Sequence, residues 1–417
     1  MNNSLFIQEF GPLPLHRPGT VAELGGLIRE AAATGQALYP YGGGTRQDFG
    51  YPPTRPGWVM DCRALAEVID YPARDMTITV QAGLTRAQLA TRLAAEGQRL
   101  PVDFPAMASG TIGGALAANL SGPRRYGFGT LRDYVIGIAF VTADGTEVKG
   151  GGRVVKNVAG YDLMKLQIGA LGTLGIITQV TLKVFPRPES SVLLGFGLNA
   201  AAVGPTLDRL HASASRPIAV ELLNAAAARV WADRSGIELP GADPWWLIAG
   251  FEEKTVTTTW QTSTLKEELK SAPVRDLTEW SGPSTDRLWQ AFTDLPDAGG
   301  GFAIQASVYP SRVAEFVSRL AALHPDVVIH AHAGNGVVYG RFPEELSLEP
   351  ARSWLEELRQ FAGSGNGRVL IRRAAVNWKK SLSLWGSPQN DWQVMRTIKS
   401  TLDPNDLFNP GRIFGLT

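Results

Sequence analysis

A run of small residues from Ala108 to Leu120 limits the possible folds of this chain more than any other stretch. Ser109, Gly110 and Thr111 form a loop that opens directly into a helix whose inner face is Gly and Ala, so another body can approach its backbone closely. The first amides of a helix have no partner inside it, and the helix dipole is positive there, which favours an anion such as a phosphate. A tight helix-packing joint would also explain this stretch, but not the glycine-rich loops elsewhere.

Two more glycine-rich loops lie at the ends of predicted strands. The first, Tyr41-Gly42-Gly43-Gly44-Thr45, follows a short strand predicted at 37–40. Consecutive glycines can point their amides inward as a cradle for phosphate oxygens, or they can form a flexible hairpin tip. The other loop, Gly169 to Gly175, leads into a long strand predicted at 176–184. None of the three loops is a Gly-x-Gly-x-x-Gly dinucleotide fingerprint, and none continues into the Gly-Lys-Ser/Thr of a Walker A loop.

Bulk composition describes an ordinary folded protein without a nucleic-acid partner. The 417 residues suffice for two or three domains, and 40 Lys and Arg balance 39 Asp and Glu to a net charge of +1. The lone Cys62 excludes an internal disulfide framework and iron–sulfur ligation by this chain. We find neither a signal-peptide pattern nor an apolar run of about 18 residues. We therefore expect a cytoplasmic protein, with peripheral attachment to the inner membrane through partners left open.

Local signals in the first half predict alternating strands and helices. Thr20 is expected to cap a helix over 20–34, with Glu23 completing a capping box and Gly35 ending the helix. Thr85 is expected to cap another helix, and Pro186 and Pro188 mark a domain boundary. The remaining predictions are strands at 58–61, 76–83 and 135–142, a turn at Asp144-Gly145, a surface loop at Gly150-Gly151-Gly152, and helices at 85–96 and 161–168.

In the second half, predicted strands and helices alternate in a different pattern, which predicts one antiparallel sheet with helices on one face. A last helix is expected at about 390–401, and the tail 405–414 is apolar enough to dock back on the first domain. The predicted strands are 191–198, 218–223, 245–251, 302–309, 327–332 and 368–375, and the predicted helices are 200–213, 258–271, 311–323 and 349–361.

Together the loops resemble the flavoprotein family named after vanillyl-alcohol oxidase and para-cresol methylhydroxylase (the PCMH type). The motifs that carry this resemblance are Tyr41–Thr45, Ser109–Gly114, Gly160-Tyr161-Asp162-Leu163 and Gly172–Thr178. The second half resembles the E-type FAD-binding subunit of the three-part glycolate oxidases. The residues that carry this second resemblance are His330–Val338, Leu384-Trp385-Gly386, and Asp403-Pro404 through Arg412.

The resemblance implies an α+β fold in three parts. Residues 1–188 would form a two-lobed PCMH-type FAD-binding domain, and residues 189–385 a smaller α+β cap domain with an antiparallel sheet. Residues 386–417 would form a C-terminal helix and tail that return to the FAD-binding domain.

The resemblance also implies FAD as the cofactor, extended between the two lobes of the first domain. The first loop would hold the pyrophosphate with its amides, the second would wrap the flavin, and the third would lie on the adenosine and pyrophosphate side. Some relatives attach the flavin through a His near the first loop; Gly and Thr stand there in this chain, so we expect non-covalent FAD, with Cys62 as a small buried residue. The expected cofactor-binding residues are Tyr41, Gly42, Gly43, Gly44, Thr45, Ser109, Gly110, Thr111, Ile112, Gly113, Gly114, Asn119, Gly172, Thr173, Gly175, Ile176 and Ile177.

The catalytic motif of the related D-2-hydroxy-acid dehydrogenases is incomplete in this chain. Those relatives carry His-x-Gly-Asp-Gly-Asn-x-His, whose histidines, with a later Glu-His pair, bind a divalent metal or the substrate and supply a base. Here His332 fills the first position, Asn335 and Val337 replace the Asp and the Asn, and Tyr339 replaces the second His. The later Glu-His-Gly segment has no counterpart, so we expect no metal site.

Oxidation of a 2-hydroxy acid needs a base for the hydroxyl proton and a cation for the carboxylate. His332 is the candidate base, and Arg372 and Arg373 are the candidate carboxylate ligands. All three also suit a purely structural role, since a His on a strand is more often a hydrogen-bonded spectator.

The function implied by the resemblance is that of an FAD-binding oxidoreductase subunit of a glycolate oxidase or dehydrogenase complex, which oxidises glycolate and similar 2-hydroxy acids to glyoxylate-type products. Its expected partners are a sister D-type FAD subunit and an F-type iron–sulfur subunit. Two alternatives stay open: a relay or structural subunit that holds FAD without its own turnover, and a stand-alone FAD-dependent oxidase for another alcohol or 2-hydroxy acid.

Overall fold

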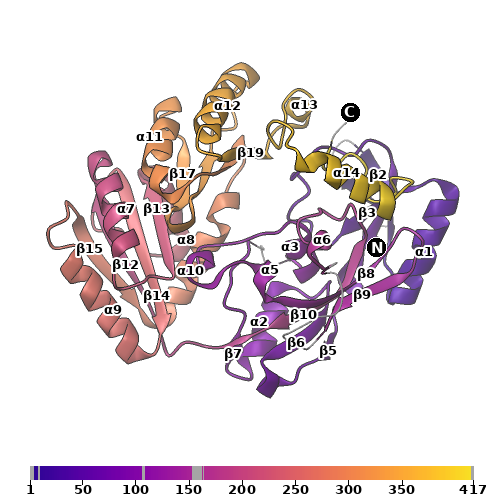
Figure 1. Cartoon of the computed structure of the whole chain (residues 1–417), viewed down its shortest axis with the longest axis horizontal. Coiled ribbons are helices and arrows are strands. Elements are labelled where there is room, and N and C mark those ends of the chain that lie inside the picture. Colours follow the sequence, from indigo (N-terminus) through magenta and orange to yellow (C-terminus); the bar gives the residue numbers. More distant parts are fainter. Residues whose placement is uncertain (1–3, 8–9, 106–108, 153–161, 163, 415–417) are drawn as a thin grey trace.

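The computed structural model describes residues 4–7, 10–105, 109–152, 162 and 164–414. Figure 1 shows two bodies side by side, the first half of the chain on one side and most of the second half on the other, with the C-terminal helix returning to the first. Gly160, Tyr161 and Leu163 of the predicted motif lie outside the described residues, and of the helix predicted at 161–168 the structure shows α6 (Met164–Gln167).

The first lobe is a four-stranded sheet in the order β1-β2-β4-β3, covered by α1 (Val21–Thr34). Thr20 caps α1 by accepting from the amide of Glu23 at 3.1 Å, and Gly35 ends the helix with a φ of 67°. The Glu23 carboxylate accepts from the amide of Gly19 at 2.7 Å, one residue before the position that a capping box would use. The strands are β1 (Ser4–Ile7), β2 (Phe10–His16), β3 (Ala37–Tyr41) and β4 (Gly57–Asp61).

The second lobe is a five-stranded antiparallel sheet in the order β5-β6-β10-β8-β9. Gly150 and Gly151 pair with Ile138 and Gly137 as the end of β9, so the surface loop predicted there is wrong for these two residues. The strands are β5 (Val68–Asp70), β6 (Thr77–Gln81), β8 (Val135–Val141), β9 (Glu147–Gly151) and β10 (Ile176–Lys183), with α2 (Arg86–Ala94), α3 (Ile112–Ala117), α4 (Arg125–Phe128) and α5 (Leu131–Tyr134) around them.

A two-stranded ribbon of β7 (Gln98–Arg99) and β11 (Phe185–Pro186) leads into the second body. That body is built on one eight-stranded antiparallel sheet in the order β15-β12-β14-β13-β17-β18-β16-β19. Its strands are β12 (Ser190–Leu198), β13 (Ala219–Asn224), β14 (Trp245–Glu253), β15 (Arg275–Ser281), β16 (Ala303–Ser307), β17 (Val328–His332), β18 (Val337–Arg341) and β19 (Arg368–Arg373).

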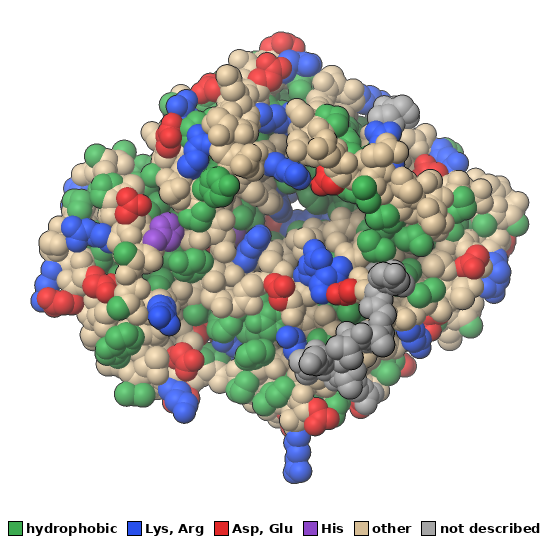
Figure 2. Space-filling model, in the orientation of Figure 1, with side chains coloured by type: hydrophobic (Ala, Val, Ile, Leu, Met, Phe, Trp, Pro, Cys, Tyr) green, Lys and Arg blue, Asp and Glu red, His purple; other side chains and the backbone are tan. Residues whose placement is uncertain are grey.

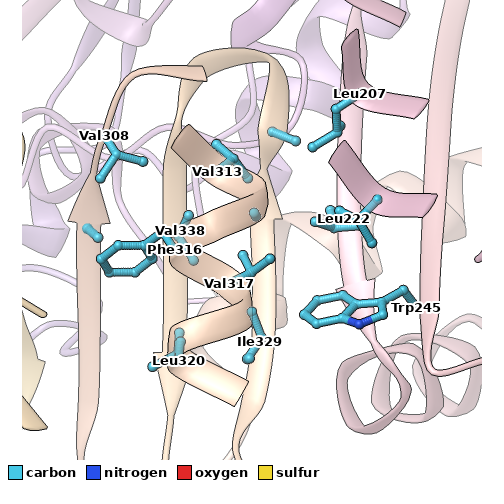
Figure 3. Packing of buried hydrophobic residues seen from close by; sticks show 14 of the residues in the cluster. Leu207, Leu222, Trp245, Val308, Val313, Phe316, Val317, Leu320, Ile329 and Val338 are labelled. Atoms are coloured by element: carbon cyan, nitrogen blue, oxygen red, sulfur yellow. The ribbon is translucent and has the colours of Figure 1, made fainter. Parts of the chain in front are cut away.

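Helices cover both faces of this sheet, so the expectation of helices on one face is wrong. One core is formed with α7 (Val203–Ala212), α9 (Thr255–Glu268), α11 (Val313–Leu323) and α12 (Leu348–Gly363). Figure 3 shows Phe316 and Leu320 of α11 packed on Val338 and Ile329 of the sheet. A separate core lies on the opposite face under α8 (Ala225–Ser235) and α10 (Thr285–Asp294). The physical reason is visible in β13, where Leu222 and Leu223 point to opposite faces and both are buried.

The C-terminal segment docks on the first lobe, as the apolar tail predicts. After α13 (Val376–Lys379) and α14 (Asp391–Leu402), Phe408 bridges to Leu38 of β3. The amide of Leu38 donates to Leu407 O at 2.7 Å, and the amide of Asn409 donates to Leu38 O at 2.9 Å. Among the described residues, no helix has the length and apolar character needed to cross a membrane.

We predict that Phe408→Ala destabilises the protein by about 3–5 kcal/mol, because the fully buried ring leaves a cavity between the tail and β3. Denaturant unfolding followed by circular dichroism measures the change. The control Val394→Ala, on an exposed position of α14, should stay within about 0.5 kcal/mol of the wild type. Equal stabilities of F408A and V394A would show that the tail is not part of the cooperative fold.

Candidate functional site

The first glycine-rich loop forms one wall of a cleft. Tyr41 to Thr45 line it together with Gly110, Thr111 and Gly114 of the second loop. The two loops touch through glycine: a Cβ at Gly43 would meet Ser109 O at 1.9 Å, and one at Gly42 would meet Thr111 Oγ1 at 2.4 Å. The glycines are therefore required by the close approach of the two loops.

The donors of this cleft fit a diphosphate. The amides of Gly43, Gly44 and Thr45 donate to no acceptor within the described part of the chain. Among the described residues that line the cleft there is no Asp or Glu, whereas Arg46 and Arg412 are present. Free amides in a cleft that no described carboxylate lines are what a pyrophosphate needs.

Other predicted cofactor residues sit behind the cleft. The amides of Ile112 and Gly113 donate to Leu84 O at 2.9 Å and to Ala82 O at 2.8 Å, which holds the start of α3 against the segment that follows β6. Asn119, with a φ of 49°, packs beside Gly169. In the third loop Leu171 lines the cleft, whereas Gly172, Thr173, Gly175, Ile176 and Ile177 do not, so their contact with the cofactor stays a prediction.

Cations from the C-terminal third fix the chain just after the first loop. Arg412 donates to Arg46 O at 3.0 Å and to Gln47 O at 2.8 Å, and burial lowers its pKa to about 10. Lys379, 2% exposed, donates to Asp48 O and to Gly50 O. Burial, reinforced by the nearby Arg412 charge, lowers the pKa of Lys379 to about 8. No local sequence pattern indicates these contacts, because each joins residues more than 300 positions apart.

A row of polar side chains crosses the cap sheet on the face that also carries α8 and α10, where Phe292 of α10 stacks on His330. The row runs over β13, β17, β18, β16 and β19, which are consecutive neighbours in the sheet. Contact with the first body is direct: the amide of Gly127 donates to Ile218 O at 2.9 Å, and Gly334 packs against the ring of Tyr126. The members of the row are Glu221, His330, His332, Tyr339, Gln305 and Arg372.

Glu221 joins the two histidines of this row. Its carboxylate lies 2.8 Å from His332 Nδ1 and also contacts His330 Nε2. Burial opposes its ionisation, but His332 and His330 outweigh burial and lower the pKa of Glu221 to about 2. An ionised carboxylate only accepts, so His332 Nδ1 and His330 Nε2 carry the protons. His332 Nε2 is then a bare acceptor, buried and without a partner among the described residues.

The same three side chains form a group that could hold a metal ion, because one ligand atom from each lies within 4.8 Å of the others. The expectation of no metal site did not consider Glu221 or His330. A lone Glu inside the apolar strand 219–223 was the available signal for Glu221, since a buried carboxylate requires a partner.

Two arginines from opposite bodies share one carboxylate. Asp297, in the 3₁₀ turn Leu295–Asp297, contacts Arg46 of the first body and accepts from Arg372 Nη2 of β19 at 2.9 Å. Burial opposes its ionisation, but Arg372 and Arg46 hold the pKa of Asp297 below the ordinary value. Two guanidinium groups against one carboxylate leave one positive charge uncompensated, and Arg46 Nε has no partner in the described residues. Arg373 lies beside them, 3.8 Å from Asp48.

Tyr339 connects the two ends of the site. Its ring lies 5.3 Å from the ring of His332 and 5.2 Å from Cζ of Arg372. Figure 2 shows a hollow between the two bodies with Lys and Arg side chains around its edge. The structure therefore brings together the predicted His332, Arg372 and Arg373, and adds Arg46, Asp297, Glu221 and His330, which the sequence interpretation missed.

Comparisons with known proteins agree with this geometry. Residues 12–151 match the family described as FAD binding domain, and residues 185–413 match FAD linked oxidases, C-terminal domain. A D-2-hydroxyglutarate dehydrogenase of Xanthomonas citri pv. viticola is 27% identical, covering 97% of this chain and 89% of the relative. The glycolate oxidase subunit GlcE of Escherichia coli is 35% identical over 168 residues, 40% of this chain and 47% of the relative. The structure of p-cresol methylhydroxylase with substrate bound has the same fold, with a TM-score of 0.74 and 16% identity over 98% of this chain and 91% of that chain.

We predict that the stability conferred by Lys379 depends on pH. Its pKa is about 8 when folded and near 10.4 when unfolded, so between these values the unfolded chain binds more protons and the free energy of unfolding rises with pH. Relative to Lys379→Met, wild-type stability should rise by up to about 3 kcal/mol from pH 8 to pH 10.5. The control Lys270→Met, at an exposed site, should show no such trend. A flat difference between wild type and K379M would contradict the buried, proton-releasing lysine.

Proposed function

Because the chain belongs to the family of FAD-linked oxidases, we propose that its cap site oxidises a small 2-hydroxy acid. The chain is an FAD-dependent oxidoreductase that acts on CH–OH groups, and FAD is its cofactor. Bound FAD supplies the acceptor for the hydride that leaves the hydroxyl-bearing carbon. The residues of the chain have three tasks: to hold the carboxylate, to take the hydroxyl proton and to keep water out. We expect the FAD to be non-covalent, because burial raises the pKa of the nearest thiol, Cys62, to about 12.

Two features of the site carry the proposal. One is the positive charge of Arg46 and Arg372 that Asp297 leaves uncompensated, and the other is His332 Nε2, which has no hydrogen-bond partner among the described residues. A substrate carboxylate would be held by Arg46 and Arg372, whose charge Asp297 only half neutralises. Guanidinium groups hold a carboxylate through two parallel hydrogen bonds, which also fixes its orientation. Arg46 directly follows the loop that would hold the pyrophosphate, so the carboxylate site adjoins the cofactor cleft.

His332 is the proposed base. Glu221 holds the proton on Nδ1, so Nε2 is free to accept the hydroxyl proton, and the resulting imidazolium would be stabilised by the Glu221 carboxylate. His332 is 2% exposed, so bulk water does not compete for Nε2. Tyr339 fills the place of the second His of related motifs and separates the base from Arg372 by the width of one ring.

A second candidate is a subunit of a glycolate oxidase complex that holds FAD as a relay or structural element. The stretch of 168 residues that is 35% identical to GlcE favours an E-type role, with a D-type sister subunit and an iron–sulfur subunit as partners and with peripheral attachment to the inner membrane through them. In that case the cap site would bind no substrate of its own. A stand-alone oxidase is the remaining alternative.

Anaerobic flavin reduction tests the proposal. The chain is purified alone with FAD, its absorption near 450 nm is recorded, and glycolate, D-lactate or D-2-hydroxyglutarate is added without oxygen. We expect at least one of these acids to bleach the band. A band that stays with all three acids, yet bleaches with dithionite, would overturn the proposal and favour the relay subunit.

Variants assign the roles. His332→Asn should slow bleaching by about 10²–10⁴-fold with little change in half-saturation, because it removes the Nε2 base while its side-chain amide can still donate to Glu221. Arg372→Met should raise the half-saturating concentration about 10–100-fold, because a charged hydrogen bond is lost. Stopped-flow spectroscopy measures both. The controls His324→Asn and Arg319→Met, away from the site, should match the wild type. Unchanged bleaching in H332N would exclude His332 as the base.

A further inference from the structure

Asp297 lies where a substrate carboxylate would have to bind. Its carboxylate contacts Arg46 and Arg372, the two guanidinium groups that would hold the substrate, and has no other hydrogen-bond partner among the described residues. The carboxylate of a 2-hydroxy acid is the same chemical group and would form the same charged hydrogen bonds with the same donors. Asp297 and a substrate would therefore compete for one pair of arginines.

The space beside these side chains is too small for a substrate. A cavity of about 30 Å³ is lined by Arg46, Asp297 and Arg372, together with Arg373. At roughly 10–15 Å³ for each water molecule, this volume takes about two waters. Even glycolate, the smallest 2-hydroxy acid, is larger than that. A substrate can reach both arginines here only if a side chain moves.

Arg372 is held in place by contacts that do not involve Asp297. Its Nη1 donates to Oε1 of Gln305 at 2.8 Å. Its Cζ also lies 5.2 Å from the ring centre of Tyr339 and 5.9 Å from that of Phe49. A guanidinium that is fixed by a hydrogen bond and by two aromatic rings does not need the carboxylate to stay in position.

Arg46 also has contacts of its own. Its Nη1 donates to the carbonyl of Thr45 at 3.1 Å, and Arg412 donates to the carbonyl of Arg46 at 3.0 Å. Neither contact uses Asp297. The side chain of Asp297 is short, is 11% exposed and is bound only to the two arginines, so it is the group that can move when a second carboxylate enters.

We propose that Asp297 is a specificity-determining residue, which competes with the substrate carboxylate for Arg46. This inference rests on the proposed function, because it concerns the carboxylate site of the same reaction. The substrate carboxylate replaces Asp297 on Arg46, and Asp297 keeps its contact with Arg372, so two carboxylates together neutralise two guanidinium groups. A neutral alcohol brings no charge that could replace Asp297, and the contact therefore selects acids over alcohols.

The sign of one substitution tests this inference. Calorimetry measures the binding of oxalate, a non-oxidisable analogue, to the FAD-loaded chain. Asp297→Asn should tighten oxalate binding about 10–100-fold, because the competing charged hydrogen bond is lost. If Asp297 instead served to position the arginines, D297N would bind oxalate no better than the wild type. That result, or no saturable binding to either protein, would overturn the inference.

Asp48→Asn is the matched control. Asp48 lines the same cavity, but its side chain is 65% exposed and lies 3.8 Å from Arg373. Solvent screens such a pair, so D48N should change oxalate affinity by no more than about fivefold. Flavin content and circular dichroism establish that the variants are folded.

A double variant keeps the test valid if D297N does not fold because two buried guanidinium groups lack an anion. Arg46→Met leaves Arg372 neutralised by Asp297 and should weaken oxalate binding about tenfold or more. Adding D297N to R46M restores the single uncompensated positive charge of the wild type. The double variant should therefore bind oxalate more tightly than R46M. Equal or weaker binding by the double variant would overturn the inference.

Oxalate binding separates this inference from the proposed function, because it needs no turnover. The expected ranking of oxalate affinities without flavin reduction by any 2-hydroxy acid would leave Asp297 as the competitor of an anion and remove the proposed oxidation. If an acid does reduce the flavin, D297N should lower its half-saturating concentration and leave the limiting rate nearly unchanged. Flavin reduction with an unchanged or higher half-saturating concentration in D297N would keep the proposed function and overturn the inference.

Discussion

The Asp297 carboxylate, shared by Arg46 and Arg372, is the interaction on which the site depends. Arg46 belongs to the first body, and Asp297 and Arg372 belong to the second, so the contact both joins the bodies and defines the site between them. One buried carboxylate cannot neutralise two buried guanidinium groups, and taking an uncompensated charge out of water is costly. A substrate carboxylate would supply the missing negative charge. The same uncompensated positive charge would then both bind the substrate carboxylate and select for substrates that carry one.

The parts of the structure with local causes could be predicted from the sequence. Thr20 and Gly35 bound the first helix as expected, and Thr85 caps α2, because capping depends on neighbours within four residues. The apolar tail through Phe408 was expected to dock and does so. The resemblance to a flavoprotein family rested in part on the first two glycine-rich loops, which the structure brings to one cleft.

The parts that depend on long-range pairing could not be predicted. Glu221 and His332 are 111 positions apart, and Arg46 and Asp297 are 251 apart, so no local pattern connects them. The two-sided burial of the cap sheet was missed because α8 and α10 were not predicted, although Leu222 and Leu223 in one strand already indicate two buried faces. The short strand β18 was read as part of a motif, since five residues carry too little periodicity to identify a strand.

The two bodies contribute different parts of the site. The first body offers free amides, a cleft with no Asp or Glu among its described lining residues, and the cation Arg46; the cap offers His332 as the proposed base, with Arg372 and Asp297 opposite Arg46. The glycines of the first two loops are needed for close packing, and the amides of Gly43 and Gly44 have no acceptor among the described residues. The proposed chemistry of the cap therefore depends on how the two bodies are held together. Lys379 and Arg412 hold the segment 46–50, which carries Arg46, by donating to its backbone carbonyls.

The most direct test of the account is a crystal structure of the FAD-loaded chain with oxalate, a non-oxidisable analogue of a small 2-hydroxy acid. The account predicts one oxalate carboxylate within hydrogen-bonding distance of both Arg46 and Arg372, and an oxygen of the other group within hydrogen-bonding distance of His332 Nε2. Oxalate bound elsewhere, with Asp297 still the sole anionic partner of both arginines, would contradict the account.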